Sequence, residues 1–113
     1  MNSDKNIKNP IRLTTHACER ARQRYRWNPE TLNRMAIKAF KQGLKRKNTK
    51  GYLKDYLDES WERHQKVSHF RLYGEIIFVF SKNNLITLWP LPSQLRSLAR
   101  AVRAKQQQHS ASA

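Results

Sequence analysis

The chain has 113 residues and suits a single domain with one modest core. Its one cysteine, Cys18, excludes an internal disulfide framework. The polar first ten residues lack the apolar core of a signal peptide, and the longest apolar run (76–80) is far too short to cross a bilayer. We therefore expect a cytoplasmic protein with no membrane partner.

Two helices are predicted in the first half of the chain. Residues 1–10 are polar and favour a disordered tail. From about Thr15 to Trp27 the apolar residues recur at helical spacing, with Thr14 or Thr15 as the N-cap. Asn28 and Pro29 form a stronger start signal, a cap followed by proline at the first helical position. We expect this second helix to run to about Lys45.

The second half changes to strand-like patterns. A third, shorter helix is predicted around 52–61, and beyond Lys66 the period becomes two residues. Three strands (69–73, 76–81 and 85–89) are separated by the short turns Gly74-Glu75 and 82–84, which is typical of an antiparallel meander. A short strand at 11–14 is a further candidate for the same sheet.

The last predicted element is a basic helix from Ser93 to Lys105, followed by a polar tail at 106–113 that we expect to be disordered. The fold class is therefore α+β: N-terminal helices packed on a small antiparallel β-meander, plus a basic C-terminal helix, in one domain over 11–105.

The charge indicates a polyanionic partner. There are 23 Lys and Arg against 8 acidic residues, a formal net charge of +15 that opposes compaction by self-repulsion. Nucleic acid, above all RNA, fits best; an anionic membrane and charge kept for solubility alone are the alternatives. Two helices carry basic stripes for flanking phosphates: Arg34, Lys38, Lys41 and Lys45, and Arg96, Arg100 and Arg103.

One group of residues suggests chemistry. His16, Arg20 and Arg24 are four residues apart and lie along one side of a helix. Guanidinium groups hold phosphate by paired hydrogen bonds, and a histidine transfers protons near neutral pH. Together they fit RNA cleavage by the 2′-hydroxyl, which needs no metal. The simpler alternative is an ordinary basic face with a histidine near the helix start.

Other polar groups carry weaker signals. Alternation places His69, Arg71 and Tyr73 on one side of a strand, where they are candidates to meet the helical group, as are Thr87 and Trp89 on another strand. Trp27 and Trp89 are also candidates for stacking on bases. Four acids share one face of the third helix, and we expect them to be solvated or ion-paired. The histidines and acids show no metal-ligand spacing, and we expect no cofactor.

Two segments resemble a known family. The opening helix, with His16-Ala17, Glu19-Arg20 and Arg24, resembles the "HA-x-ER-x-x-x-R" start of small RelE-like proteins, in the barnase–colicin–RelE class of ribonuclease-type toxins. The segments 72–80 and 84–89 are similar to the closing strands of that class. The third helix and the long basic C-terminal helix look like additions.

The resemblance implies a metal-independent ribonuclease of toxin or phage-effector type. It makes His16 the proton-transfer group, Arg20 and Arg24 the phosphate ligands, and Thr87 a polar positioning group. In our leading hypothesis, Arg71 joins Thr87 in orienting the substrate. Two alternatives stay open: a non-catalytic module that binds RNA, DNA or the ribosome, and an inhibitor of a host nucleic-acid enzyme. A toxin would also have an antitoxin partner covering its basic face.

Overall fold

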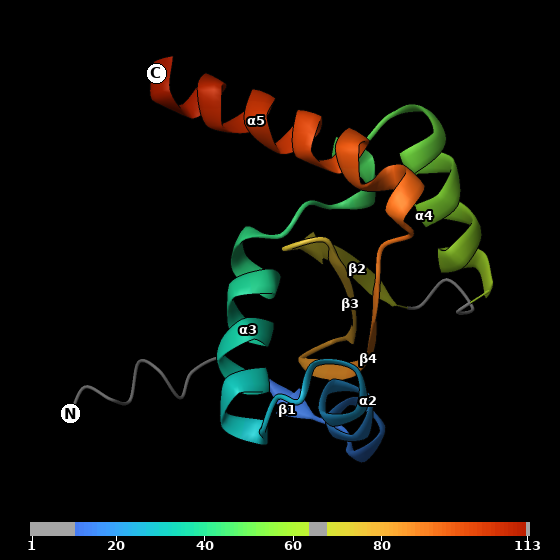
Figure 1. The fold of residues 1–113 in the computed structure, drawn as a ribbon, viewed down its shortest axis with the longest axis vertical. Helices are drawn as coiled ribbons and strands as arrows, with labels where there is room; N and C mark the ends of the chain where they lie inside the picture. Colours follow the sequence, from blue (N-terminus) through green and yellow to red (C-terminus); the bar gives the residue numbers. More distant parts are fainter. Residues whose placement is uncertain (1–10, 64–67, 113) are drawn as a thin grey trace.

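The computed structural model describes residues 11–63 and 68–112, with side chains described up to residue 105 (Figure 1). The predicted tail at 1–10 lies outside this range. The helices and strands follow one another as β1 (Arg12–Leu13), α2 (Thr15–Tyr25), α3 (Pro29–Gln42), α4 (Gly51–Arg63), β2 (His69–Tyr73), β3 (Ile76–Ser81), β4 (Asn84–Pro90) and α5 (Arg96–Ser112). Short 3₁₀ turns, η1 (Arg46–Asn48) and η2 (Ser93–Leu95), precede α4 and α5. The predicted α+β fold class is confirmed.

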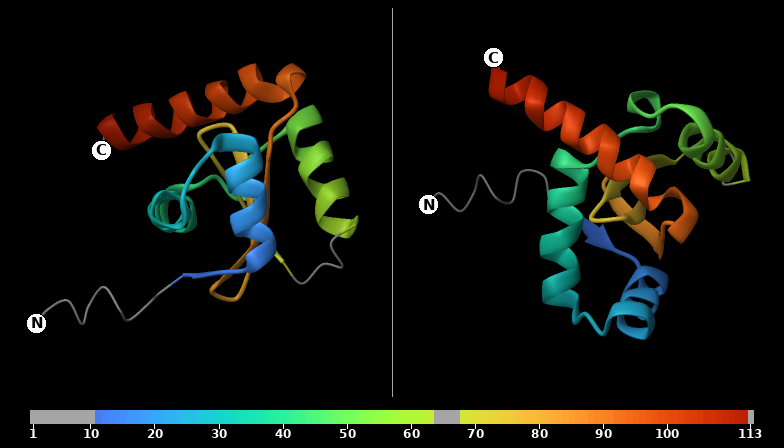
Figure 2. Two further views of the ribbon diagram at one scale, coloured as in Figure 1. Left: turned by 60° about the horizontal axis from the view of Figure 1, so that its bottom comes forward. Right: turned by 45° about the horizontal axis from the view of Figure 1, so that its top comes forward.

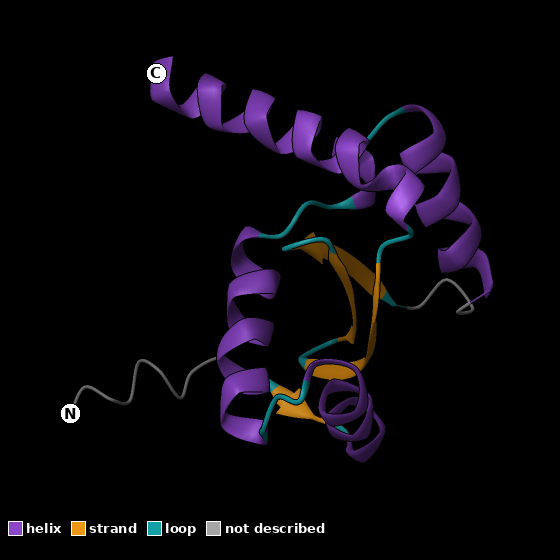
Figure 3. Cartoon of the chain, in the orientation of Figure 1, coloured by secondary structure: helices purple, strands orange, loops and turns teal. Residues whose placement is uncertain are grey.

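The sheet has the strand order β1-β4-β3-β2 and lies between the helices (Figure 3). Strands β2, β3 and β4 form the predicted antiparallel meander. The short N-terminal strand is also present, but it pairs with β4 in parallel, through Arg12 with Asn84 and Leu13 with Leu85. The sheet is therefore mixed, because the β1–β4 pair is parallel whereas the pairs within the meander are antiparallel.

The pairing of β3 with β4 shifts by one residue partway along. Val79 pairs with Thr87, whereas the next residue, Phe80, pairs with Leu85. Ile86 is the extra residue on β4, which is a β-bulge. Leu85 and Thr87 therefore face opposite sides of the sheet, although two residues at this spacing in a regular strand would face the same side.

Helices lie on both sides of the sheet (Figure 1), and each face of the sheet carries a separate core. On one face, α2 and α3 pack their buried alanines and Leu32 against residues of β3 and β4: Ile76, Phe78, Phe80, Leu85 and Leu88. On the other face, α4 and α5 pack against the alternate residues of β2 and β3: Phe70, Leu72, Ile77 and Val79. Alternation along β2 and β3 thus directs their buried side chains to one core or the other.

Two helix ends differ from the sequence-based expectation. Helix α3 ends at Gln42 and not near Lys45, because Leu44 leaves the helix, is buried and pairs with Leu72 at the outer edge of β2. The two residues exchange backbone hydrogen bonds of 2.9 Å each. Helix α5 continues to Ser112, through most of the segment that we expected to be a disordered tail. The alanines and glutamines of this segment favour helix.

Thr14 connects the start of α2 to the sheet. Its Oγ1 accepts a hydrogen bond from the Ala17 backbone N–H at 3.1 Å, which makes it the N-cap. The same hydroxyl donates to the carbonyl oxygens of Leu85 and Ile86, at 2.9 and 3.2 Å. One side chain therefore both starts the helix and fixes it to β4.

We expect Thr14→Ala to lower the free energy of unfolding by about 1–2 kcal/mol, because it removes an N-cap and the hydroxyl hydrogen bond to the Ile86 carbonyl, while the Leu85 carbonyl keeps the Thr14 backbone N–H as its donor. Urea denaturation followed by circular dichroism measures this. The control is Thr15→Ala, an exposed neighbour, which we expect to change stability by less than about 0.5 kcal/mol. Equal effects of the two substitutions would contradict this role for Thr14.

Asp58 fixes the segment before α4 to that helix. Its carboxylate accepts hydrogen bonds from Arg46 at 2.6 Å and from Lys54 at 2.7 Å. For Asp58, the expected ion pairing of the acidic face of α4 is confirmed. The hydrogen bond from Lys54, followed by that from Arg46, lowers the pKa of the Asp58 carboxyl.

A lowered pKa in the folded state means that Asp58 stabilises the fold above its unfolded-state pKa. This contribution is lost as the pH falls through the folded-state value. We expect a carboxyl ¹³C NMR titration to give Asp58 a midpoint below that of an aspartate in the unfolded chain, and Lys54→Gln to raise it. Lys50→Gln, at an exposed position, is the control and should leave the midpoint unchanged.

Candidate functional site

Helix α2 lies along the outer edge of β4. The parallel strand β1 pairs only with Asn84 and Leu85, so the rest of this edge has no strand partner among the described residues. Arg24 provides a side-chain hydrogen bond at this edge, because its Nη1 donates to the carbonyl oxygen of Leu88 at 2.8 Å. Buried Ala17 and Ala21 pack into the core on one side of α2. The opposite, polar side of the helix is thereby held beside the strand.

This arrangement creates an open hollow of about 370 Å³ between α2, β4 and α4. The left view of Figure 2 shows α2 and α4 flanking β4. The lining residues come from all three elements: His16, Arg20 and Arg24 from α2, Thr87 and Trp89 from β4, and Tyr56, Ser60 and Arg63 from α4. None of these eight residues is acidic, so three guanidinium groups give the hollow a positive potential.

The arginines of α2 keep most of their hydrogen-bonding capacity. Arg20 donates from Nη1 to Gln23 Oε1 at 3.1 Å, and Arg24 uses its Nη1 on the sheet. A guanidinium has five N–H donors, so both side chains are oriented by one contact and retain donors for an anion. Neither arginine takes part in an ion pair with a carboxylate of the described residues. The hollow is therefore suited to binding a phosphate.

Trp89 is held as a fixed aromatic wall of the hollow. Its Nε1 donates to the Tyr56 hydroxyl at 3.0 Å, and its ring meets Phe70 edge-on, with centroids 5.9 Å apart. Trp27, the other tryptophan that we considered for base stacking, instead stacks on Tyr25 with centroids 4.8 Å apart and packs on the core. Of these two, Trp89 is the one that lines the hollow.

The structure brings four of the five predicted catalytic residues together, namely His16, Arg20, Arg24 and Thr87. Arg71 does not join them. It pairs with Phe78, whose side chain lies in the core on the α3 face, whereas Thr87 pairs with Val79 of the opposite core. The expectation that Arg71 and Thr87 orient one substrate is therefore wrong, because the two side chains lie on opposite faces of the sheet.

The predicted basic stripes are only partly free. Arg34, Lys38 and Lys41 are exposed on α3, but Lys45 lies beyond the end of that helix. On α5, Arg96 and Arg100 both contact Glu75.

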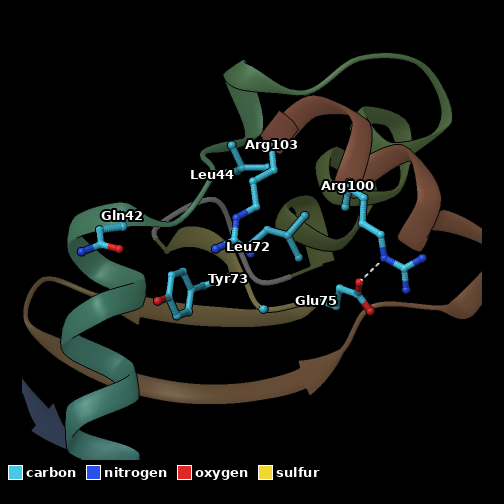
Figure 4. A pocket seen from close by; sticks show the side chains of 9 residues that line it. Gln42, Leu44, Leu72, Tyr73, Glu75, Arg100 and Arg103 are labelled. Carbon is cyan, nitrogen blue, oxygen red and sulfur yellow. Dashed lines mark hydrogen bonds and ion pairs between the residues drawn. The ribbon is translucent and has the colours of Figure 1, made fainter. Parts of the chain in front are cut away.

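Figure 4 shows the small hollow beside these contacts, which Tyr73, Arg100 and Arg103 help to line. Arg103 lies over the Tyr73 ring, 5.6 Å from its centroid. Each arginine of the α5 stripe thus has a contact within the chain, whereas Arg34, Lys38 and Lys41 of α3 form no ion pair with a carboxylate of the described residues.

The contribution of α4 was not predicted from the sequence. Tyr56, Ser60 and Arg63 follow one another at steps of four and three residues, so they share one helical face. That spacing was available as a signal, but it does not tell which strand the face meets.

No protein-family model, curated protein or solved structure matches this chain. The resemblance to the RelE-like class therefore stays a prediction based on its two motifs. Over residues 11–63 and 68–112, no group of three or more His, Cys, Asp and Glu side chains is placed to hold a metal ion. The helices in this same part of the chain include none with the length and apolarity to span a bilayer.

Proposed function

We propose that the protein binds RNA and cleaves it as a metal-independent endoribonuclease, with the hollow between α2, β4 and α4 as its active site. The observation that supports this most directly is the shared lining: a histidine, three arginines and a threonine hydroxyl face one space without an acidic residue. A phosphodiester needs cationic donors, a proton-transfer group and exclusion of competing carboxylates, and these residues meet all three needs.

In this proposal Arg20, Arg24 and Arg63 bind the phosphate at the scissile bond. Arg24 is already fixed by its hydrogen bond to Leu88, so binding costs little of its conformational freedom. A base next to the phosphate stacks on Trp89, whose indole is held by Tyr56. The Thr87 hydroxyl orients the ribose or a phosphate oxygen.

The chemical step uses His16 as the general base. The imidazole accepts the proton of the ribose 2′-hydroxyl, and the 2′-oxygen attacks phosphorus. The bond from phosphorus to the 5′-oxygen breaks, and the leaving oxygen takes up a proton from solvent or from the imidazolium. The products are a 2′,3′-cyclic phosphate and a free 5′-hydroxyl. The arginines stabilise the negative charge that builds up on the phosphorane.

The first test incubates the full-length protein with end-labelled total RNA and tRNA in the presence of EDTA. We expect discrete cleavage with cyclic-phosphate ends, and a loss of about 10²–10⁴-fold in rate for His16→Ala, because a general acid–base group is removed. Thr15→Ala is the matched control on the same helical turn, exposed and outside the hollow lining. A loss below about threefold for His16→Ala would remove this residue from the mechanism.

A non-catalytic RNA-binding module is the second candidate function. It is favoured by the exposed cations of α3 (Arg34, Lys38 and Lys41), which make no ion pair with a described carboxylate and suit a phosphate backbone without any chemistry. Intact RNA that nevertheless shifts on a gel in a salt-sensitive manner would select this function over cleavage.

Both functions predict that the hollow contributes to RNA affinity. We expect Arg20→Gln to weaken binding and to lower the slope of log affinity against log salt by about 1, because one phosphate contact is lost. Arg22→Gln removes the same charge from the same helix at an exposed site outside the hollow lining and should have a smaller effect. Fluorescence anisotropy with a labelled single-stranded RNA at several salt concentrations measures both variants, and equal effects would exclude the hollow as the binding site.

A further inference from the structure

Arg71 is a half-buried cation without an acidic partner. Its Nη1 donates to the carbonyl oxygen of the adjacent Phe70 at 3.1 Å, and its guanidinium lies over the Phe40 ring, 5.6 Å from the centroid. Its Nε is shielded from solvent and has no hydrogen-bond partner. Among the described residues, no carboxylate forms an ion pair with Arg71.

A half-buried guanidinium destabilises the fold unless an anion or further hydrogen bonds compensate its charge. Burial lowers the pKa of the Arg71 guanidinium, which reflects the cost of removing a cation from water. A buried cation usually has a counter-ion or a full set of hydrogen bonds. Asp58, which contacts the neighbouring Arg46, already accepts hydrogen bonds from two cations. An anion from outside the chain would supply the missing partner.

The space beside Arg71 has a size and a basic lining that suit such an anion. Arg71 lines a second open hollow, of about 190 Å³, together with Lys45, Arg46 and Lys47 from the segment after α3 and Ser68 from the start of β2. No acidic residue lines it. The Ser68 hydroxyl oxygen is also buried without a hydrogen-bond partner. Four basic residues and Ser68 thus line a space large enough for several water molecules.

We propose that this second hollow binds a phosphoryl group, either as free phosphate or as a phosphodiester of a nucleic acid. Arg71 is its inner ligand, because a guanidinium binds phosphate oxygens in a paired geometry. Lys45 and Lys47 at the exposed rim add point charges. The proposal does not depend on the ribonuclease function, since the two hollows share no lining residue.

The test follows the side-chain Nε–H signals of arginine by ¹⁵N NMR in the full-length His16→Ala protein, so that RNA cleavage plays no part. The Arg71 signal is assigned from its absence in Arg71→Lys. Inorganic pyrophosphate is titrated at constant ionic strength. We expect the Arg71 signal to move and to saturate, and Lys45→Gln with Lys47→Gln to weaken the affinity at least threefold. Both lysines are exposed, so this double variant keeps the fold even if Arg71→Lys does not.

A second arm uses a single-stranded RNA without terminal phosphates. The charge-matched control is Arg22→Gln with Lys38→Gln, which removes two exposed cations outside the lining of this hollow. Movement of the Arg71 signal with pyrophosphate identifies a site for free phosphate, and movement with RNA alone identifies the phosphodiester as the ligand. The proposal is overturned if neither ligand moves this signal. It is equally overturned if the control double variant weakens the response as much as the double lysine variant.

Discussion

The open edge of β4 is the constraint on which the rest of the structure depends. A strand edge exposes backbone donors and acceptors that need partners, and this strand has a strand neighbour on its outer side for only its first two residues. Beyond these two residues, Thr14 donates to the Ile86 carbonyl and Arg24 to the Leu88 carbonyl, from the two ends of α2. Because the same helix carries His16 and Arg20, the contacts that complete the sheet also position the candidate active site.

Two acidic side chains also hold separate segments of the chain together. The chain has few acidic residues, and Asp58 and Glu75 are each shared between two basic side chains. Both lie where separate segments must be joined: Asp58 holds the segment before α4, and Glu75 in the β2–β3 turn holds the start of α5. These two carboxylates therefore join segments of the fold, and neither of them lines one of the two proposed sites. Arg63 of the candidate site also borders a separate hollow that is lined by acidic residues of α4, namely Asp55, Asp58, Glu59 and Glu62.

Local patterns were sufficient to predict most of the elements. The cap and proline at Asn28-Pro29, the turn at Gly74-Glu75 and the alternation along 69–73 depend on neighbours in sequence, and the structure has each of them. The end of α3 also has a local signal, the C-cap Gly43, although the sequence-based prediction placed the end near Lys45. The pairing of Leu44 with Leu72 could not be predicted in this way, because Leu72 is far away in sequence.

In the candidate site, too, some features follow from local sequence spacing and others depend on the packing of distant segments. The common face of His16, Arg20 and Arg24 follows from helical spacing, and the structure places all three in one hollow. The inclusion of Arg63 and the exclusion of Arg71 depend on which helix covers which face of the sheet. That is decided by packing between distant segments, about which the spacing of residues along one strand or helix says nothing.

The extra residue in β4 has a consequence for how this chain can vary. If the pairing set by Leu85 and Phe80 continued without the shift, Thr87 would lie opposite Phe78 and its side chain would enter the core on the α3 face. Trp89 would be carried to the same side, and Leu88 would be turned out of its core. A one-residue slip of β4 against β3 beyond Leu85 would thus exchange interior positions with positions that line the hollow, although every amino acid of the site would still be present. Deletion of Ile86, in contrast, would remove the bulge and leave Thr87 opposite Val79 in a regular ladder. The register of β4 against β3, together with the identity of the residues, therefore decides which side chains line the hollow.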